Sequence, residues 1–290
     1  MPHLTASGTL RPAIGADRLG IGVPGYAHPL LAPVEWAELL RFSRLYAAGP
    51  DHPGHTAPLH WTVLNVAEGP GARPDPHCLE AVGRLRNAGL RVLGHLDMTY
   101  GARAFAELVS DAQSFLDWYR VDGFYLDRCP ADREELPATR RLTGTLRSML
   151  DGADTGAATG ADIGADTAGG DPEGGARLVL GHGTHPYPGY AETADQLVTF
   201  SGPWTDYRWS QAAPWTAAYP ASRFCHLVHG VPRTHLEEAL RIARWQGAGT
   251  IWFTDRTDRD RAGDRASSPW EALPGYWDEI VSRIGPSVSE

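Results

Sequence analysis

The chain has 290 residues, a formal net charge of −9 and 42% hydrophobic residues, enough for one large α/β domain or two small ones. The acidic balance argues against a nucleic-acid or anionic-membrane surface, and no apolar run approaches the ~20 residues that a membrane-spanning helix needs. Residues 1–20 lack an apolar segment behind a basic start, so we expect a cytoplasmic protein, or a secreted one if the start site is misassigned. Cys78, Cys129 and Cys225 have no zinc-binding spacing, and we expect neither a metal nor a cofactor.

Short apolar runs alternate with helical patterns along the first half of the chain. A loose leader is expected at residues 1–18, and strands are expected at 19–24, 60–66 and 90–97. One helix follows Pro33, a second is capped by Asp75 and ended by Gly89, and a third runs through residues 105–118. The next run, 123–126, is apolar without alternation, which is typical of a strand covered on both faces.

The second half continues the alternation around one unusual segment. Residues 132–150 are expected to form a helix that Pro137 disturbs, whereas 152–176 offer almost nothing apolar to bury and predict a disordered insertion. Strands follow at 177–181, 196–200, 223–229 and 249–255, and helices at 235–245 and 276–284. This order predicts one (β/α)8 TIM-type barrel over residues 19–284 with a tail at 285–290. A doubly wound sheet is the alternative, although no Gly-x-Gly-x-x-Gly follows the first strand.

The carboxyl-terminal ends of the strands form the active face of such a barrel. Three acids end strands there and are the catalytic candidates: Asp97, Asp127 and Asp255. Other side chains at this face are candidates for substrate binding: Tyr26, His28, Asn65, Glu68, His95, Tyr100, Arg128, His182, Trp204 and His229. The plainer interpretation is that the acids cap helices or pair with arginines, and that each histidine is a hydrogen-bonded wall residue.

Two chemistries fit these side chains. Glycoside hydrolysis needs two carboxyl groups, ~5–5.5 Å apart when the anomeric configuration is retained and ~6.5–9.5 Å apart when it is inverted. Asp97 and Asp127 end neighbouring strands and could flank a sugar. Metal-assisted hydrolysis needs histidines and carboxylates as ligands, and His95-x-Asp97 has a suitable alternation.

Aromatic residues are abundant, with 10 Trp and 10 Tyr, and aromatic rings suit sugar rings as well as protein cores. Trp204, Trp209 and Trp215 cluster after the sixth strand in a loop rich in Pro and Ser. We predict that at least one of them is exposed and stacks on a sugar ring. The competing interpretation is that all three pack under the loop.

Five segments carry a pattern known from one protein family. They are Gly22-Val23-Pro24 with Tyr26, Leu64-Asn65 with Gly69-Pro70-Gly71, Gly89-Leu90-Arg91-Val92-Leu93-Gly94, Thr99-Tyr100-Gly101 and Asp122-Gly123-Phe124-Tyr125-Leu126-Asp127. Together they resemble the spherulin-4-like family, also called spherulation-specific family 4, over roughly residues 19–284. The resemblance implies a (β/α)8 barrel. It also implies a glycoside hydrolase that cuts α-1,4-linked, galactosamine-containing microbial exopolysaccharide in an endo-acting manner.

The resemblance further implies an Asp-Glu pair ending the fourth strand and a Glu ending a later one. Asp127 matches the Asp of the pair, but Arg128 replaces its Glu and Ser201 replaces the later Glu. The family's Asn-Pro-Gly is replaced by Gly181-His182-Gly183. An ion pair with Arg128 would lower the pKa of Asp127.

A hydrolase would therefore need another carboxylate beside Asp127, with Asp97 the first expectation and Asp255 the second. The first alternative is a non-catalytic carbohydrate-binding barrel, and the second is a metal-dependent hydrolase that uses His95 and Asp97. The expected partner is a carbohydrate, with no nucleic acid and no membrane.

Overall fold

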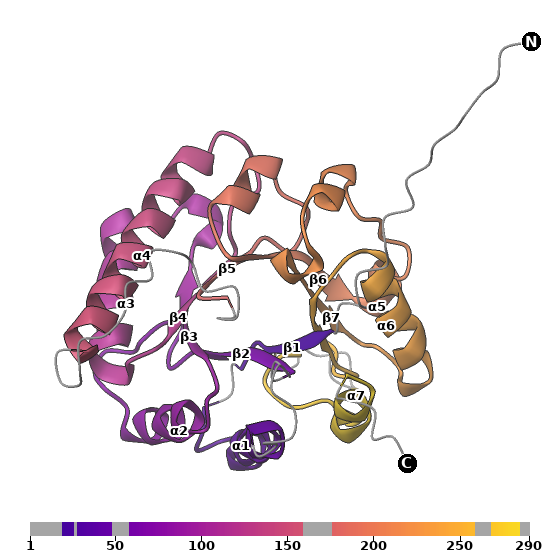
Figure 1. The fold of residues 1–290 in the computed structure, drawn as a ribbon, viewed down its shortest axis with the longest axis horizontal. Coiled ribbons are helices and arrows are strands. Elements are labelled where there is room, and N and C mark those ends of the chain that lie inside the picture. The colour runs from indigo at the N-terminus through magenta and orange to yellow at the C-terminus, as the bar shows by residue number, and fades with distance from the viewer. Residues whose placement is uncertain (1–18, 26–27, 48–57, 159–175, 259–267, 285–290) are drawn as a thin grey trace, which may run out of the picture.

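A computed structural model describes residues 19–25, 28–47, 58–158, 176–258 and 268–284. Its parallel strands close into a barrel in chain order, and helices surround it (Figure 1). The strands are β1 (Gly20–Val23), β2 (Leu59–Leu64), β3 (Val92–Asp97), β4 (Gly123–Asp127), β5 (Leu178–Gly181), β6 (Gln196–Pro203), β7 (Phe224–His229) and β8 (Thr250–Phe253). This confirms the predicted (β/α)8 barrel over the doubly wound sheet.

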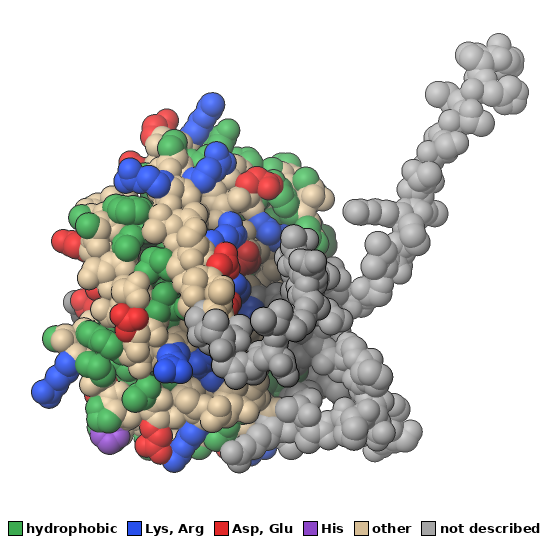
Figure 2. Space-filling view, turned by 60° about the vertical axis from the view of Figure 1, so that its left-hand side comes forward, with side chains coloured by type: hydrophobic (Ala, Val, Ile, Leu, Met, Phe, Trp, Pro, Cys, Tyr) green, Lys and Arg blue, Asp and Glu red, His purple; other side chains and the backbone are tan. Residues whose placement is uncertain are grey.

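The connections carry helices of unequal length. The α-helices are α1 (Pro33–Ala47), α2 (Pro76–Asn87), α3 (Phe105–Tyr119), α4 (Leu136–Ala158), α5 (Trp204–Tyr207), α6 (Leu236–Trp245) and α7 (Trp277–Ile284). The short 3₁₀ helices are η1 (Thr99–Gly101), η2 (Pro188–Glu192), η3 (Pro214–Ala218), η4 (Ala221–Arg223) and η5 (Arg233–His235). On the face that Figure 2 brings forward, basic, acidic and apolar side chains are interspersed. No helix within the described residues is both long and apolar enough to cross a bilayer.

Helix α4 differs from the prediction in two ways. Pro137 lies in its first turn, where a helix needs no intrahelical N–H bond, so it does not disturb the helix. The helix also continues through residues 152–158, which were expected to be disordered. Arg177, just before β5, pairs with Asp151 (3.1 Å) and Asp154 (2.9 Å) and so binds this last part of α4 to the barrel. Residues 159–175 of the expected insertion lie outside the described residues, as do the leader at 1–18 and the tail at 285–290.

A polar cluster occupies the amino-terminal end of the barrel. The Trp61 indole N–H donates to Gln196 Oε1 (2.9 Å), and Gln196 Nε2 donates to the Thr250 hydroxyl (2.8 Å), which His60 Nδ1 also contacts (2.7 Å). A methyl group on Gly22 would lie 2.3 Å from the Trp61 ring, so this glycine provides the room for the indole. The cluster satisfies its own hydrogen bonds. The opposite, carboxyl-terminal end holds the polar side chains described below.

All three cysteines are free and buried. Burial raises the pKa of the Cys78 thiol to about 12. It also raises the pKa of Cys129 and Cys225 above the ordinary value. These thiols therefore act as small apolar core side chains.

Two buried histidines should make the fold sensitive to mild acid. Burial lowers the pKa of His182 to about 4 and that of His226 to about 3, from an ordinary 6.5. Between the ordinary pKa of 6.5 and these lowered values, the unfolded chain binds protons that the native state excludes. The contribution of the two neutral histidines to the free energy of unfolding is therefore complete above pH ~6.5 and is lost as the pH falls towards 4. We expect a loss on the order of several kcal/mol over this range, measured by urea unfolding at successive pH values.

The His226→Gln variant should show a shallower dependence of unfolding free energy on pH. The His77→Gln variant, changed at an exposed position of α2, is the matched control and should keep the wild-type slope. Equal wild-type stability at pH 7 and pH 5 would contradict the prediction.

Candidate functional site

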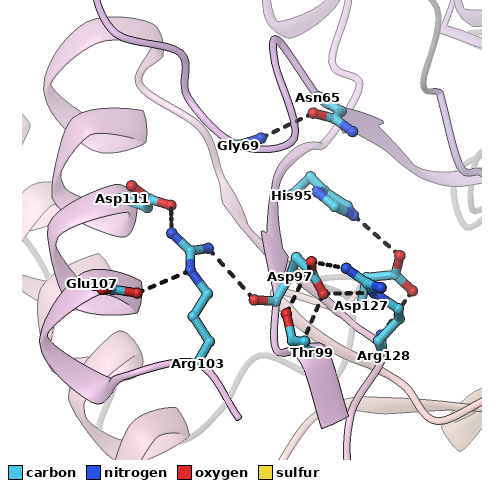
Figure 3. A network of polar contacts seen from close by, with 10 residues as sticks. All are labelled: Asn65, Gly69, His95, Asp97, Thr99, Arg103, Glu107, Asp111, Asp127 and Arg128. Carbon is cyan, nitrogen blue, oxygen red and sulfur yellow. Dashed lines mark hydrogen bonds and ion pairs between the residues drawn. The ribbon is translucent and has the colours of Figure 1, made fainter. Parts of the chain in front are cut away.

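The site is built on two neighbouring parallel strands. In the β3–β4 register, Asp97 lies opposite Asp127 and His95 lies opposite Tyr125. Side chains two positions apart on a strand share a face, so His95, Asp97 and Asp127 are brought to one side of the sheet. Their polar contacts are drawn in Figure 3. The structure thus brings together three of the residues that the sequence analysis nominated.

Asp127 ends β4 with its carboxylate partly open to solvent, at 30% exposure of the side chain. Its Oδ2 lies 3.3 Å from His95 Nε2, and its Oδ1 accepts the backbone N–H of Arg128 (2.9 Å). The His95 imidazole is buried and lies nearly parallel to the Tyr125 ring, with centroids 6.4 Å apart. The strand and the imidazole together hold the Asp127 carboxylate in place at the barrel mouth.

Asp97 is held by a different set of groups. Arg128 Nε donates to Asp97 Oδ1 (2.8 Å) and Nη2 donates to Oδ2, while Thr99 donates its N–H to Oδ1 (2.8 Å) and its hydroxyl to Oδ2 (3.2 Å). Burial alone would raise the pKa of Asp97, but the hydrogen bonds and charge of Arg128, with the bonds from Thr99, lower it below the ordinary value. Asp97 is therefore an ionised carboxylate with both oxygens engaged. The prediction that Arg128 pairs with Asp127 is wrong, because the Arg128 guanidinium reaches across to Asp97 on β3.

The backbone around these acids is unusual. Among the described residues, five that are not glycine have positive φ, and four of them follow β2, β3 or β4: Glu68, Thr99, Tyr100 and Arg128. The αL conformation of Arg128 (φ 49°) turns its side chain back towards Asp97, and its carbonyl accepts the N–H of Tyr100 (2.7 Å). Such conformations cost about 1–3 kcal/mol each and cluster at functional sites.

A further layer fixes the loop after β3. Arg103 donates to the backbone carbonyl of Asp97 (3.5 Å), and its guanidinium also pairs with Asp111 and Glu107 on α3. Arg103 could not be found from the sequence, because only its tertiary contact distinguishes it from other helix-flanking arginines. On the other side, Asn65 Oδ1 accepts the Gly69 N–H (3.1 Å), so Asn65 shapes the loop after β2.

Other nominated side chains lie in the wall or elsewhere. His182 bonds the Pro130 carbonyl (2.9 Å) and packs on Tyr190, and burial lowers its pKa to about 4, so it is a neutral wall residue. His229 is buried against Trp270, and burial lowers its pKa as well. Asp255 accepts the Gly275 N–H (2.9 Å) just after β8, a strand that does not neighbour β4.

The remaining candidate residues are exposed, buried or outside the described residues. Glu68 and Tyr100 are exposed beside the site, whereas Tyr26 lies outside the described residues. Trp204 is buried at 5% exposure and cannot serve as a sugar platform, which corrects its nomination. Trp209 is an exposed member of this cluster, as expected, and its stacking on a sugar ring stays a prediction.

The group of potential metal ligands found among the described residues includes none of His95, Asp97 and Asp127. It consists of His28, Asp75 and Cys78 at the start of α2, with His28 Nε2 3.4 Å from Asp75 Oδ2. Leu30 donates its N–H to His28 Nδ1 (3.2 Å), which keeps the proton of a neutral ring on Nε2, the atom that would have to bind a metal. The arrangement fits a hydrogen-bonded pair better than a metal site. His95 and Asp97, in turn, already engage Asp127 and Arg128.

Comparison with solved structures reveals a close match in fold. The structure of Aspergillus clavatus Sph3 in complex with GalNAc has a TM-score of 0.66 and 23% sequence identity to this chain, and the match covers 92% of this chain and 97% of that chain. Deoxyribose phosphate aldolase from Aeropyrum pernix has a TM-score of 0.42 and 12% identity, with 83% and 86% coverage. The C-terminal domain of a putative chitinase from Desulfitobacterium hafniense has a TM-score of 0.41 and 14% identity, with 86% and 71% coverage.

A search among curated proteins finds no match. The family comparison bears out the resemblance read from the five sequence segments. Residues 20–284 match the model of Spherulin4, spherulation-specific family 4, and the chain belongs to this family.

Proposed function

We propose that this barrel is a glycoside hydrolase that acts on an amino-sugar-containing polysaccharide of the galactosamine type. The observation that carries the proposal is the Asp127 carboxylate, held by His95 at the barrel mouth with Asp97 beside it on the next strand. Further support comes from the similar fold of a protein crystallised with GalNAc.

The two acids suit different roles. Asp97 is kept ionised by Arg128, which makes it a poor proton donor but able to oppose the positive charge that develops at the anomeric carbon. Asp127 is then the group that protonates the leaving oxygen. Neighbouring strands lie ~4.8 Å apart, and two registered carboxylates on such strands favour the shorter, retaining separation.

The test is the release of reducing ends from galactosamine-rich polymer. Asp97→Asn should lower turnover by about 100-fold or more, because it removes the ionised carboxylate and leaves the Arg128 charge uncompensated. Asp122→Asn is the matched control: its carboxylate pairs with Arg86 (2.8 Å) at the opposite end of the same strands. That variant should lose stability while the folded enzyme keeps wild-type turnover. Wild-type turnover in Asp97→Asn would exclude the assigned role.

A second candidate function is carbohydrate binding without hydrolysis. It is favoured by Arg128, which engages both oxygens of Asp97, the carboxylate that lies in register with Asp127. Asp127 would then accept hydrogen bonds from sugar hydroxyls. Calorimetric binding of an amino-sugar oligosaccharide with no release of reducing ends would support this function over the first.

A further inference from the structure

The turn that follows β3 has a backbone conformation that its residue types do not favour. Thr99, Tyr100 and Gly101 have φ values of 45°, 55° and 89° in succession, all in the left-handed region. Glycine adopts this region freely, whereas a β-branched residue such as Thr is an outlier there. Thr99 and Tyr100 are exposed, so core packing does not require their side chains at these positions. Such strain persists where the surrounding contacts impose it.

The contacts that impose this conformation come from the end of β4. Met98 donates its N–H to the Asp127 carbonyl (2.9 Å), and Tyr100 donates its N–H to the Arg128 carbonyl (2.7 Å). These bonds continue the β3–β4 pairing past the strand ends, where Asp97 lies opposite Asp127. They therefore fix the backbone of one acid relative to that of the other.

Thr99 uses this backbone conformation to contact the Asp97 carboxylate twice. Its N–H donates to Oδ1 (2.8 Å) and its hydroxyl donates to Oδ2 (3.2 Å), as Figure 3 shows. Arg128 also donates once to each oxygen, so each oxygen is held by two groups. A glycine would relieve the left-handed strain but would lack the hydroxyl, and the Thr methyl restricts the hydroxyl to few rotamers. The strained residue is thus the one that supplies a side-chain bond to the acid.

The same contacts also have a purely structural interpretation. A carboxylate that accepts the N–H two residues further on forms an Asx turn, which stabilises a chain reversal. Asn or Gly would close the same turn with less strain, however, and this turn is bonded to the strand end that carries Asp127. We infer that Thr99 is a positioning residue for hydrolysis, which fixes the direction of the Asp97 carboxylate beside Asp127, an inference that rests on the proposed function.

The experiment separates the hydroxyl of Thr99 from its β-branch. Thr99→Val keeps the branch without the hydroxyl, Thr99→Gly loses both, and Thr99→Ser keeps the hydroxyl. Reducing-end release from galactosamine-rich polymer gives kcat and KM, and urea unfolding gives the midpoint. The Val and Gly variants should both lower kcat about tenfold with KM within about twofold of wild type, whereas the Ser variant should keep the wild-type kcat. The midpoint should be higher for Gly than for Val, because glycine relieves the strain.

A second comparison uses Asp97→Asn as the background. A residue that acts through Asp97 has nothing left to position once the carboxylate is gone. Adding Thr99→Val to Asp97→Asn should therefore not lower the remaining rate further, so that the effects of the two substitutions do not add.

Two controls match the two properties of Thr99. Thr205→Val removes a hydroxyl that donates to a different carboxylate, Asp206 Oδ1 (3.1 Å), and should keep the wild-type kcat. Arg120→Gly relieves the left-handed residue that ends α3 (φ 53°), at the amino-terminal end of the barrel, and should raise the urea midpoint without changing kcat.

The outcomes distinguish this inference from the proposed function. Wild-type kcat in Thr99→Val and Thr99→Gly, with only the urea midpoint changed, would overturn the inference and leave the proposed function standing. An equal loss from Thr99→Val with and without the Asp97 carboxylate would also overturn it, because Thr99 would then not act through Asp97. Absence of turnover by wild type would reject the proposed function and the inference together.

Discussion

Replacing Asp127 by Asn should lower the hydrolysis of galactosamine-rich polymer by about three orders of magnitude or more, with the fold preserved. Asn matches the shape of Asp and can still contact His95, but it cannot donate a proton to a leaving oxygen. Asp127 ends β4, whose other four residues are all buried, so the substitution changes the chemistry without moving the backbone. Initial rates of reducing-end release, with melting curves for both proteins, make the measurement.

Asp132→Asn is the control for this variant. Asp132 is exposed in the loop that leads from β4 to α4, so the change removes an equal charge close to the site in sequence, and turnover should stay at the wild-type level. Full turnover by Asp127→Asn would place the chemistry elsewhere in the barrel. A wild type that binds an oligosaccharide without cleaving it would instead support the binding function, and Asp127→Asn should then weaken that binding.

The Gly123→Ala variant should be destabilised by about 3 kcal/mol or more, the upper end for overpacking a core. A methyl group at Gly123 would lie 2.0 Å from the carbonyl oxygen of Arg177 and 2.8 Å from Leu93. That carbonyl accepts the N–H of Phe124 (2.8 Å), so it cannot move away without opening the pairing of β4 with β5. We expect the melting temperature to fall by roughly 10 °C.

Gly144→Ala is the matched control for Gly123→Ala. Gly144 is an exposed position inside α4 with no atom within 4 Å of the added methyl, so the same chemical change should stabilise the protein by about 0.5–1 kcal/mol. Opposite signs at the two glycines would show that the cost arises from the close approach of strands. A loss of less than 0.5 kcal/mol at Gly123 would mean that the barrel relaxes around the methyl.

The fold was predictable because each buried strand is a short apolar run with its own turn signals. Strand boundaries were missed by a few residues where the ladder, not the side chains, decides them: β6 runs on to Pro203, past the predicted end at residue 200. The end of α4 was missed for the opposite reason. The Gly, Ala and Asp residues at this end of α4 predict little apolar burial. Only the ion pair of Arg177 with Asp154 shows what holds this part of the helix.

The site was predictable only as a set of strand ends. The strand ends place Asp97 and Asp127 at one rim of the barrel. Which of the two acids Arg128 pairs with depends on backbone geometry, which residue types do not reveal. The positive φ of Arg128 sends its side chain to Asp97, where sequence proximity suggested Asp127. Likewise, nothing in the sequence spacing distinguishes the buried Trp204 from the exposed Trp209.

Closure of the barrel also dictates when the fold can be completed during synthesis. The seam pairs Gly20 and Ile21 of β1 with Thr250 and Ile251 of β8, the first strand with the last. A growing chain therefore exposes the unpaired edge of β1 until β8 has left the ribosome, and parallel pairings over such sequence separations form slowly. The finished barrel has no free edge, so the danger of edge-to-edge aggregation falls on the nascent chain rather than on the folded protein.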